Sequence, residues 1–225
     1  MPTALILGAS RGLGQALVEE YLRRGWDVIA TIRSDGALSA VQREAGDRLK
    51  IEKLDITDWP GAEALCGRLE GQSLDLLFVN AGIADDGARI GDVEPARFME
   101  VLVVNALAPL RILDRFSNLL RPAGTLAVMS SSLASIADNI GGGAEVYRMS
   151  KAALNMGLRS IAARNTAPGR TYIAAAPGWV RTTMGGPDAP LSIQQSIPSL
   201  VDMLSRRHSN GGVHFVTYDD RTLSW

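Results

Sequence analysis

A tyrosine and a lysine four residues apart are the strongest candidates for proton chemistry in this sequence. The segment Tyr147-Arg148-Met149-Ser150-Lys151 is followed by Ala-Ala-Leu, and these residue types favour a helix. Residues four apart share one helix face, so Tyr147 and Lys151 would point into the same site. An ammonium beside a phenol favours the phenolate, and we expect Lys151 to lower the pKa of Tyr147 toward neutrality. Such a tyrosine can exchange a proton with a carbonyl or alcohol oxygen; the alternative is an ordinary helix-surface contact.

A glycine-rich turn near the N-terminus has the context of a dinucleotide-binding turn. Thr3–Leu7 is a short apolar run typical of a buried parallel strand. The turn Gly8-Ala9-Ser10-Arg11-Gly12-Leu13-Gly14 follows it and leads into a helical pattern. Glycines let a pyrophosphate approach the backbone, and the helix N-terminus offers free N–H groups. The longer first gap between glycines leaves room for Ser10 and Arg11 to reach the cofactor.

The residue after the second expected strand indicates which dinucleotide binds. In this kind of site, an acidic residue at that position binds the ribose 2′-hydroxyl. Arg33 stands there instead, and a guanidinium can hold a phosphate in a bidentate manner. With Arg11 nearby, the sequence predicts NADP(H) in preference to NAD(H). The alternatives are that Arg33 is a solvated strand-end charge, or that Asp35, two residues later, takes the ribose.

The remaining chain alternates short apolar runs with helical patterns. The expected strands span 3–7, 26–32, 49–54, 74–79, 125–129, 171–176 and 213–217. The expected helices span 15–24, 38–45, 62–69, 98–120, 147–164 and 193–204. This alternation predicts an α/β fold, a Rossmann-type doubly wound seven-stranded parallel sheet with helices on both faces, in a single domain over residues 1–225.

Small and polar residues follow several of the expected strands. Ligands bind at the carboxyl ends of the strands in such sheets. Asn80-Ala81-Gly82 would let a flat cofactor lie against the backbone, and the hydroxyls of Ser130-Ser131-Ser132 would face the same crevice. Serines at strand ends are also common in loops. We expect Asp85-Asp86 to be a solvated loop pair, and Asn105, inside an expected helix, to need a side-chain hydrogen bond.

Composition excludes several classes of function. The chain has 225 residues and a formal net charge of −1, which provides no electrostatic footprint for nucleic acid or an anionic membrane. Its one cysteine, Cys66, cannot form an internal disulfide and suits a reducing compartment. Two histidines with one cysteine do not predict a metal site. Because no membrane-spanning run and no signal peptide is evident, we expect a cytoplasmic protein.

Together these motifs resemble the short-chain dehydrogenase/reductase family, in its compact single-domain branch. The resemblance runs from Thr3 to Val216. One departure is Val79, which replaces the first asparagine of the family's Asn-Asn-Ala-Gly and bears on how the fourth strand is braced. The segments Pro177-Gly178-Trp179-Val180 and Met184-Gly185-Gly186 are similar to the carbonyl-reductase-like subgroup that includes sniffer and C-factor proteins.

The resemblance implies a catalytic tetrad of Asn105, a strand-end serine, Tyr147 and Lys151. At the family's usual spacing the serine position would be Ala134. Aligning the strand ends instead gives Ser131, sixteen residues before Tyr147, with a three-residue insertion in the glycine loop 141–143. Ser132 is the alternative serine.

The resemblance also implies a cofactor-binding set. In this set Asp55 would contact the adenine, Lys151 the nicotinamide ribose and Thr182 the carboxamide. The implied cofactor-binding residues are Gly8, Ser10, Arg11, Gly12, Leu13, Gly14, Arg33, Asp55, Ile56, Asn80, Ala81, Gly82, Tyr147, Lys151, Pro177, Gly178, Val180 and Thr182.

The implied activity is an NADP(H)-dependent oxidoreductase that interconverts a carbonyl and an alcohol by hydride transfer. Tyr147 would be the general acid/base, Ser131 would polarise the carbonyl, and Asn105 would hold a water. The partner would be a small-molecule carbonyl or alcohol substrate, in a pocket shaped by Leu133, Trp179 and the loop 183–193, and the assembly a homodimer or homotetramer. One alternative is a non-catalytic NADP(H)-binding regulatory protein. A sugar-nucleotide epimerase is disfavoured because only about 43 residues follow Thr182.

Overall fold

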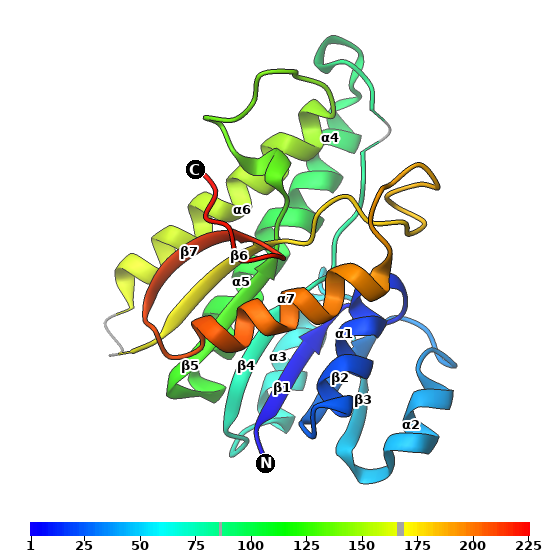
Figure 1. Cartoon of the computed structure of the whole chain (residues 1–225), viewed down its shortest axis with the longest axis vertical. Helices are drawn as coiled ribbons and strands as arrows, with labels where there is room; N and C mark the ends of the chain where they lie inside the picture. Colours follow the sequence, from blue (N-terminus) through cyan, green and yellow to red (C-terminus); the bar gives the residue numbers. More distant parts are fainter. Residues whose placement is uncertain (86, 166–168) are drawn as a thin grey trace.

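The computed structural model describes residues 1–85, 87–165 and 169–225. Over these residues, seven strands form one parallel sheet in the order β3-β2-β1-β4-β5-β6-β7 (Figure 1). The strands are β1 (Thr3–Leu7), β2 (Asp27–Ile32), β3 (Leu49–Lys53), β4 (Leu74–Val79), β5 (Leu120–Met129), β6 (Thr171–Ala176) and β7 (Gly212–Thr217). The order reverses between β1 and β4, which is where such sheets bind ligands.

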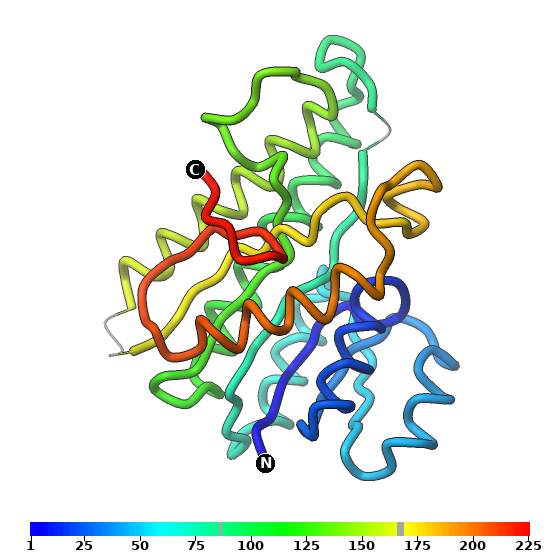
Figure 2. Tube along the Cα trace, viewed as in Figure 1, coloured from blue at the N-terminus to red at the C-terminus, as the bar shows by residue number. Residues whose placement is uncertain are grey.

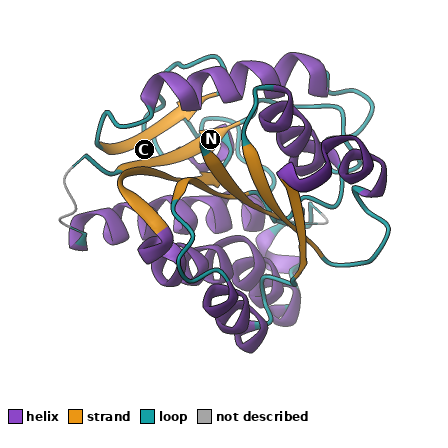
Figure 3. Cartoon of the chain, turned by 90° about the horizontal axis from the view of Figure 1, so that it is seen from below, coloured by secondary structure: helices purple, strands orange, loops and turns teal. Residues whose placement is uncertain are grey.

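Helices cover both faces of the sheet (Figure 3). They are α1 (Gly12–Arg23), α2 (Ser39–Ala45), α3 (Trp59–Arg68), α4 (Pro95–Leu102), α5 (Ala108–Phe116), α6 (Glu145–Arg164) and α7 (Ile193–Arg207). One hydrophobic cluster lies between the sheet and α3, α5 and α6, and a second lies between the sheet and α1 and α7. Every residue of β4 and β6 is buried, which explains their unbroken apolar runs. The predicted fold class is confirmed.

The single helix expected over 98–120 is wrong, because the chain there changes conformation several times. α4 ends at Leu102, a π-helical turn spans Val103–Leu107, and α5 follows. Pro109 lies in the first turn of α5 and has no N–H to donate to the carbonyl of Asn105, so a regular α-helical ladder cannot pass this point. β5 then begins at Leu120, earlier than the expected 125.

The other element boundaries shift by a few residues for local reasons. α3 begins at Trp59 because the Asp58 side chain accepts a hydrogen bond from Gly61 N at 3.1 Å, a helix N-cap. α7 begins after a capping box formed by Ser192 and Gln195 and continues to Arg207 despite Pro198. In the described part of the chain, no helix has the length and apolar character needed to cross a bilayer.

The C-terminal segment folds back on β7, the edge strand of the sheet (Figure 2). Val216 pairs antiparallel with Thr222, and Leu223 N donates to Phe215 O at 2.8 Å. The Trp225 ring lies 5.3 Å from the Phe215 ring, measured between centroids. The chain thereby covers part of its own exposed strand edge.

Candidate active site

The glycine turn is locked between the ends of β1 and β4. A Cβ atom on Gly8 would lie 2.7 Å from atoms of Ala81, and one on Gly14 would lie 2.1 Å from the carbonyl oxygen of Gly8. The side-chain amide of Asn80 donates to that same oxygen at 2.7 Å. Gly8 and Gly14 are therefore required by packing, and Asn80 and Ala81 are part of the same unit.

The remaining glycine of the turn and the start of α1 fit an anionic pyrophosphate. Gly12 has a φ of +57°, and among the described residues beyond its own helix and chain neighbours only Thr182 Cγ2, at 3.9 Å, lies within 4 Å of its hypothetical Cβ. Arg11 at the N-cap makes no side-chain cap hydrogen bond, so no capping side chain satisfies the N–H groups of the first turn of α1. These groups and the positive end of the helix dipole favour an anion here. Thr182, which the family resemblance implies as a cofactor contact, lies across from this turn.

Ser10, Arg33 and Asp55 come together beside the turn. Arg33 N donates to Ser10 Oγ at 3.3 Å, and Arg33 Nη1 lies 4.0 Å from Asp55 Oδ2. The Arg33 side chain is 66% exposed, so its guanidinium can still bind a phosphate. The hydroxyl and backbone N–H of Thr57 donate to Asp55 and lower the pKa of its carboxyl. Asp35, the rival to Arg33, instead pairs with Lys53 Nζ at 3.2 Å.

The structure brings Tyr147, Ser131 and Lys151 to the carboxyl end of β5. Lys151 Nζ lies 5.7 Å from the centroid of the Tyr147 ring and donates to Met129 O at 2.8 Å. The Ser131 hydroxyl is hydrogen-bonded to the Tyr147 hydroxyl and also accepts from Leu133 N at 3.1 Å. This contact distinguishes the two candidate serines, because Ser132 is exposed.

The expected lowering of the Tyr147 pKa by Lys151 is wrong for this structure. Burial raises the pKa of Tyr147 to about 12, although the hydrogen bond with Ser131 lowers it, and the negative charge of Asp85 raises it further. Burial also lowers the pKa of Lys151 to about 8. Near pH 7 Tyr147 therefore keeps its proton, and Lys151, with a lowered pKa, carries most of its charge.

Asn105 holds the loop after β4 against α6. It is fully buried in the π-helical turn. Its Oδ1 accepts from Ile83 N at 2.8 Å, while its Nδ2 donates to Ile83 O at 2.9 Å and to Ser150 Oγ at 3.0 Å. A Cβ on Gly82 would lie 3.2 Å from Asn105 Oδ1 and 3.4 Å from Lys151 Nζ. The hydrogen bond that a mid-helix asparagine needs is thus made to a remote loop.

Asp85 caps the helix that carries the tyrosine. Ala144 at the N-cap of α6 has no side-chain acceptor, and Asp85 Oδ2 accepts from Tyr147 N at 3.4 Å. The sequence predicted that Asp85 is a solvated loop residue. The structure instead places its carboxylate at the positive end of a helix. Asp86, the second member of the pair, lies outside the described residues.

Hydrogen bonds hold the segment after β6, residues 177–185, to α7 and also link its own residues to one another. Ser196 Oγ donates to Pro177 O at 2.7 Å, and Gly185 N donates to Thr182 Oγ1 at 3.0 Å. Trp179 Nε1 donates to Gly185 O at 2.7 Å, yet the side chain is 57% exposed. The Trp179 indole is consequently tethered while most of its surface faces solvent.

Sequence reasoning missed three buried polar residues that brace the site, Thr31, Ser150 and Asn155. Gly8 N donates to the Thr31 hydroxyl at 3.1 Å, and Ser130 Oγ donates to Asn155 Oδ1 at 2.7 Å. Ser150 links Asn105 to α6, because its hydroxyl donates to Tyr147 O at 2.7 Å. Asn155 lies four residues after Lys151, and this helical spacing is the signal that could have placed it on the same face.

The sequence and the fold both match known proteins over most of the chain. The sequence model of the short chain dehydrogenase family matches residues 2–190. A short-chain dehydrogenase/reductase from Burkholderia multivorans, solved with bound NADP, is 46% identical, with a TM-score of 0.97 over 100% of this chain and 99% of that one. The carbonyl reductase Sniffer of D. melanogaster is 30% identical, with a TM-score of 0.92 over 100% of both chains. C-signal of Myxococcus xanthus is 37% identical over 157 residues, 68% of this chain and 93% of its own.

The lowered pKa of Lys151 predicts a pH-dependent stability. An unfolded lysine binds its proton up to about pH 10.5, whereas the folded one releases it near 8, so the buried ammonium destabilises the fold below pH 8 and this cost disappears as the pH rises through 8 to 10.5. The free energy of unfolding should therefore rise over this window by roughly 1–3 kcal/mol relative to Lys151→Met. Urea titrations of both proteins between pH 7 and 10 measure it, and parallel curves would contradict the assignment.

Proposed function

The chain belongs to the short-chain dehydrogenase/reductase family, and we propose that it is an NADP(H)-dependent oxidoreductase that interconverts a carbonyl and an alcohol by hydride transfer. The observation that carries this proposal is the hydrogen-bonded pair of Ser131 and Tyr147 hydroxyls beside the buried Lys151 ammonium. The substrate is a small-molecule carbonyl compound or alcohol. A single domain over residues 1–225 holds the whole site.

In this proposal the two hydroxyls bind the substrate oxygen. Ser131 donates a hydrogen bond that polarises the carbonyl, and Tyr147 delivers the proton as negative charge develops on the oxygen. NADPH, when bound, supplies the hydride that the carbonyl carbon accepts. A tyrosine whose pKa is raised to about 12 holds its proton at neutral pH, so the phenol is available as the proton donor when a carbonyl is reduced.

Lys151 and Asn105 assist Tyr147, but neither of them donates the proton to the substrate. The Lys151 ammonium lies near the ring and stabilises negative charge left on the phenol oxygen after proton transfer. Asn105 fixes the loop at Ile83 and the Ser150 hydroxyl, which in turn bonds to the carbonyl of Tyr147. Asn105 therefore positions the tyrosine helix, in addition to the water-holding role that the family resemblance implies.

The cofactor preference follows from charge beside the glycine turn. Arg33 occupies the place of a ribose-binding acid, and its guanidinium is largely exposed next to Ser10. A 2′-phosphate at this place would gain a charge-assisted hydrogen bond. The Burkholderia multivorans structure contains NADP, which supports the same preference for NADP(H) over NAD(H).

The remaining expectations complete the proposal. We propose that the protein is a homodimer or homotetramer in the cytoplasm, where its free and buried Cys66 would stay reduced. The loop 183–193 and the tethered Trp179 indole, with Leu133 beside Ser131, shape the substrate pocket.

Removing the tyrosine hydroxyl should abolish turnover without affecting cofactor binding. For Tyr147→Phe we expect kcat to fall by about 10²–10⁴-fold, because the proton donor is lost. Steady-state assays with a panel of aldehydes, ketones and quinones measure this, and a fluorescence titration should give an NADPH Kd close to that of the unaltered protein. Tyr21→Phe, which alters a buried phenol packed on Trp26, is the matched control. Normal turnover in Tyr147→Phe would refute the proposed role.

The neighbouring serines offer an internal comparison. Ser131→Ala removes the hydroxyl that touches Tyr147 and should lower kcat by about 10²-fold or more. Ser132→Ala removes an exposed hydroxyl and should leave kcat nearly unchanged. The same carbonyl assay measures both variants. Equal losses of kcat in the two variants, or a larger loss in Ser132→Ala, would show that the proposed role of Ser131 is wrong.

Arg33 should determine the cofactor preference. Because Arg33→Ala removes a charged hydrogen bond to the 2′-phosphate, we expect KM for NADPH to rise by about 10–100-fold while KM for NADH hardly changes. Parallel kinetics with the two cofactors measure the ratio. An unchanged preference would show that Arg33 does not bind the phosphate.

A further inference from the structure

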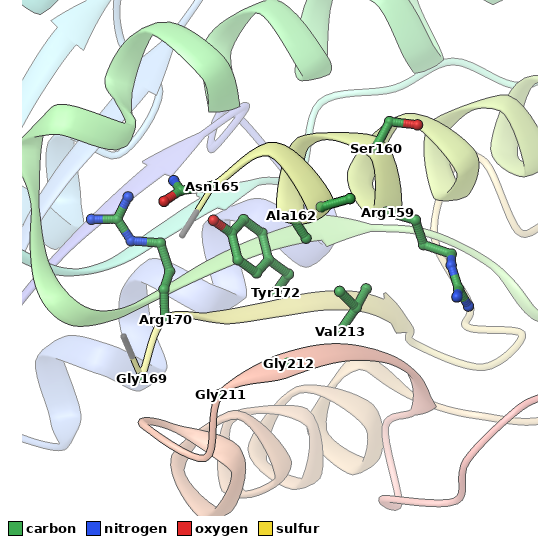
Figure 4. Close-up of a pocket in the computed structure, with 11 residues that line it drawn as sticks. Arg159, Ser160, Ala162, Asn165, Gly169, Arg170, Tyr172, Gly211, Gly212 and Val213 are labelled. Atoms are coloured by element: carbon green, nitrogen blue, oxygen red, sulfur yellow. The ribbon is translucent and has the colours of Figure 1, made fainter. Parts of the chain in front are cut away.

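A cavity of about 570 Å³ lies beside the C-terminal half of α6, at the start of β6 and β7 (Figure 4). Its volume is within the range of small-molecule sites, roughly 300–1,000 Å³. The strands begin at this edge of the sheet, whereas Ser131 follows the end of β5 at the opposite edge. The cavity is therefore separate from the site of the proposed reaction.

The charges around this cavity all have one sign. Among its described lining residues, Arg159 and Arg170 are charged and no aspartate or glutamate is present. Neither arginine makes an ion pair with any residue that the structure describes. The guanidinium carbon of Arg159 lies 4.7 Å above the ring of Trp225, so the C-terminal residue holds it in place. The cavity consequently favours an anion, although the whole chain has a formal charge of −1.

Two buried polar groups lie next to each other at the cavity. The Tyr172 side chain is only 3% exposed, and its hydroxyl interacts with the Arg170 side chain. Arg170 Nε is buried and has no hydrogen-bond partner within the described part of the chain. In Figure 4 the Tyr172 hydroxyl and the Arg170 guanidinium point toward the same end of the cavity, and Arg159 lies at the other end. A buried donor without a partner is costly, so a ligand oxygen placed there would relieve that cost.

The rest of the wall is suited to an apolar group. Ala162, Val213 and the ring of Tyr172 line the cavity between its two charged ends. Burial raises the pKa of Tyr172, and the charge and hydrogen bond of the nearby Arg170 lower it in part, so the phenol stays protonated and its hydrogen remains available to a ligand. A guanidinium and a phenol hydroxyl together match the two oxygens of a carboxylate or phosphate.

We propose that this cavity binds a small organic anion, a carboxylate or phosphate monoester whose oxygens meet Arg170 and Tyr172 and whose apolar body lies along Ala162 and Val213. The ligand is recognised by its anionic group and its apolar body together. Because α6 and β6 also lead to Tyr147 and Pro177, a ligand here contacts the same elements that build the catalytic edge.

The test is calorimetric titration of the full chain, saturated with NADPH, with benzoate and with phenyl phosphate. We expect one of the two to bind at a single site, with benzyl alcohol and inorganic phosphate binding at least about tenfold more weakly. The stronger of the two probes then identifies the anionic group. Arg170→Gln should weaken binding by about tenfold or more, and Tyr172→Phe by about threefold to tenfold. Arg43→Gln, which alters an exposed arginine on α2, should bind like the unaltered protein.

A second measurement locates the bound probe even if a variant folds poorly. In ¹H–¹⁵N spectra of the unaltered protein, the Trp225 indole resonance should shift on binding, while that of Trp179 stays in place. Binding of benzyl alcohol as strong as that of benzoate, or a shift at Trp179 alone, would overturn the proposal. So would equal affinity in Arg170→Gln and Arg43→Gln, or no binding of either anion.

Discussion

The hydrogen bond from Lys151 Nζ to Met129 O, at 2.8 Å, is the contact on which the candidate active site depends. It joins the N-terminal half of α6 to the last residue of β5, two residues before Ser131. Lys151 is 3% exposed, and a buried ammonium with one carbonyl partner destabilises the folded state. The chain therefore accepts a cost in stability in order to place a positive charge beside the Tyr147 ring.

A second buried network holds α6 from the other side. Asn105 contacts the backbone of Ile83 with both ends of its amide and also donates to Ser150. The π-helical turn that contains Asn105 arises where Pro109 interrupts the helical hydrogen bonding. A local irregularity in one helix is thus used to fix the helix that carries Tyr147, and satisfied buried networks of this kind make a site rigid.

The two edges of the sheet differ in how tightly their residues pack. At the carboxyl edge, the end of β1, the end of β4 and the start of α1 meet so closely that only glycine fits at positions 8 and 14. At the amino edge, β6 and β7 leave room beside α6, and two arginines face that space without acidic partners among the described lining residues. Dense packing at one edge holds the turn in shape for a cofactor, while loose packing at the other leaves a cavity that faces these two arginines.

The sequence alone determined the sheet, because strand and helix periodicity is a local property. The bounds of β1, β4 and β6 and the end of α6 at Arg164 agree with the predictions. Motif spacing also placed the glycine turn and the Tyr147–Lys151 pair correctly on their elements. Only the tertiary structure decided which serine meets Tyr147, that Asp85 caps α6, and that burial raises the pKa of Tyr147 instead of Lys151 lowering it. These outcomes depend on side-chain direction and on exclusion of water by segments remote in sequence, which local spacing does not encode.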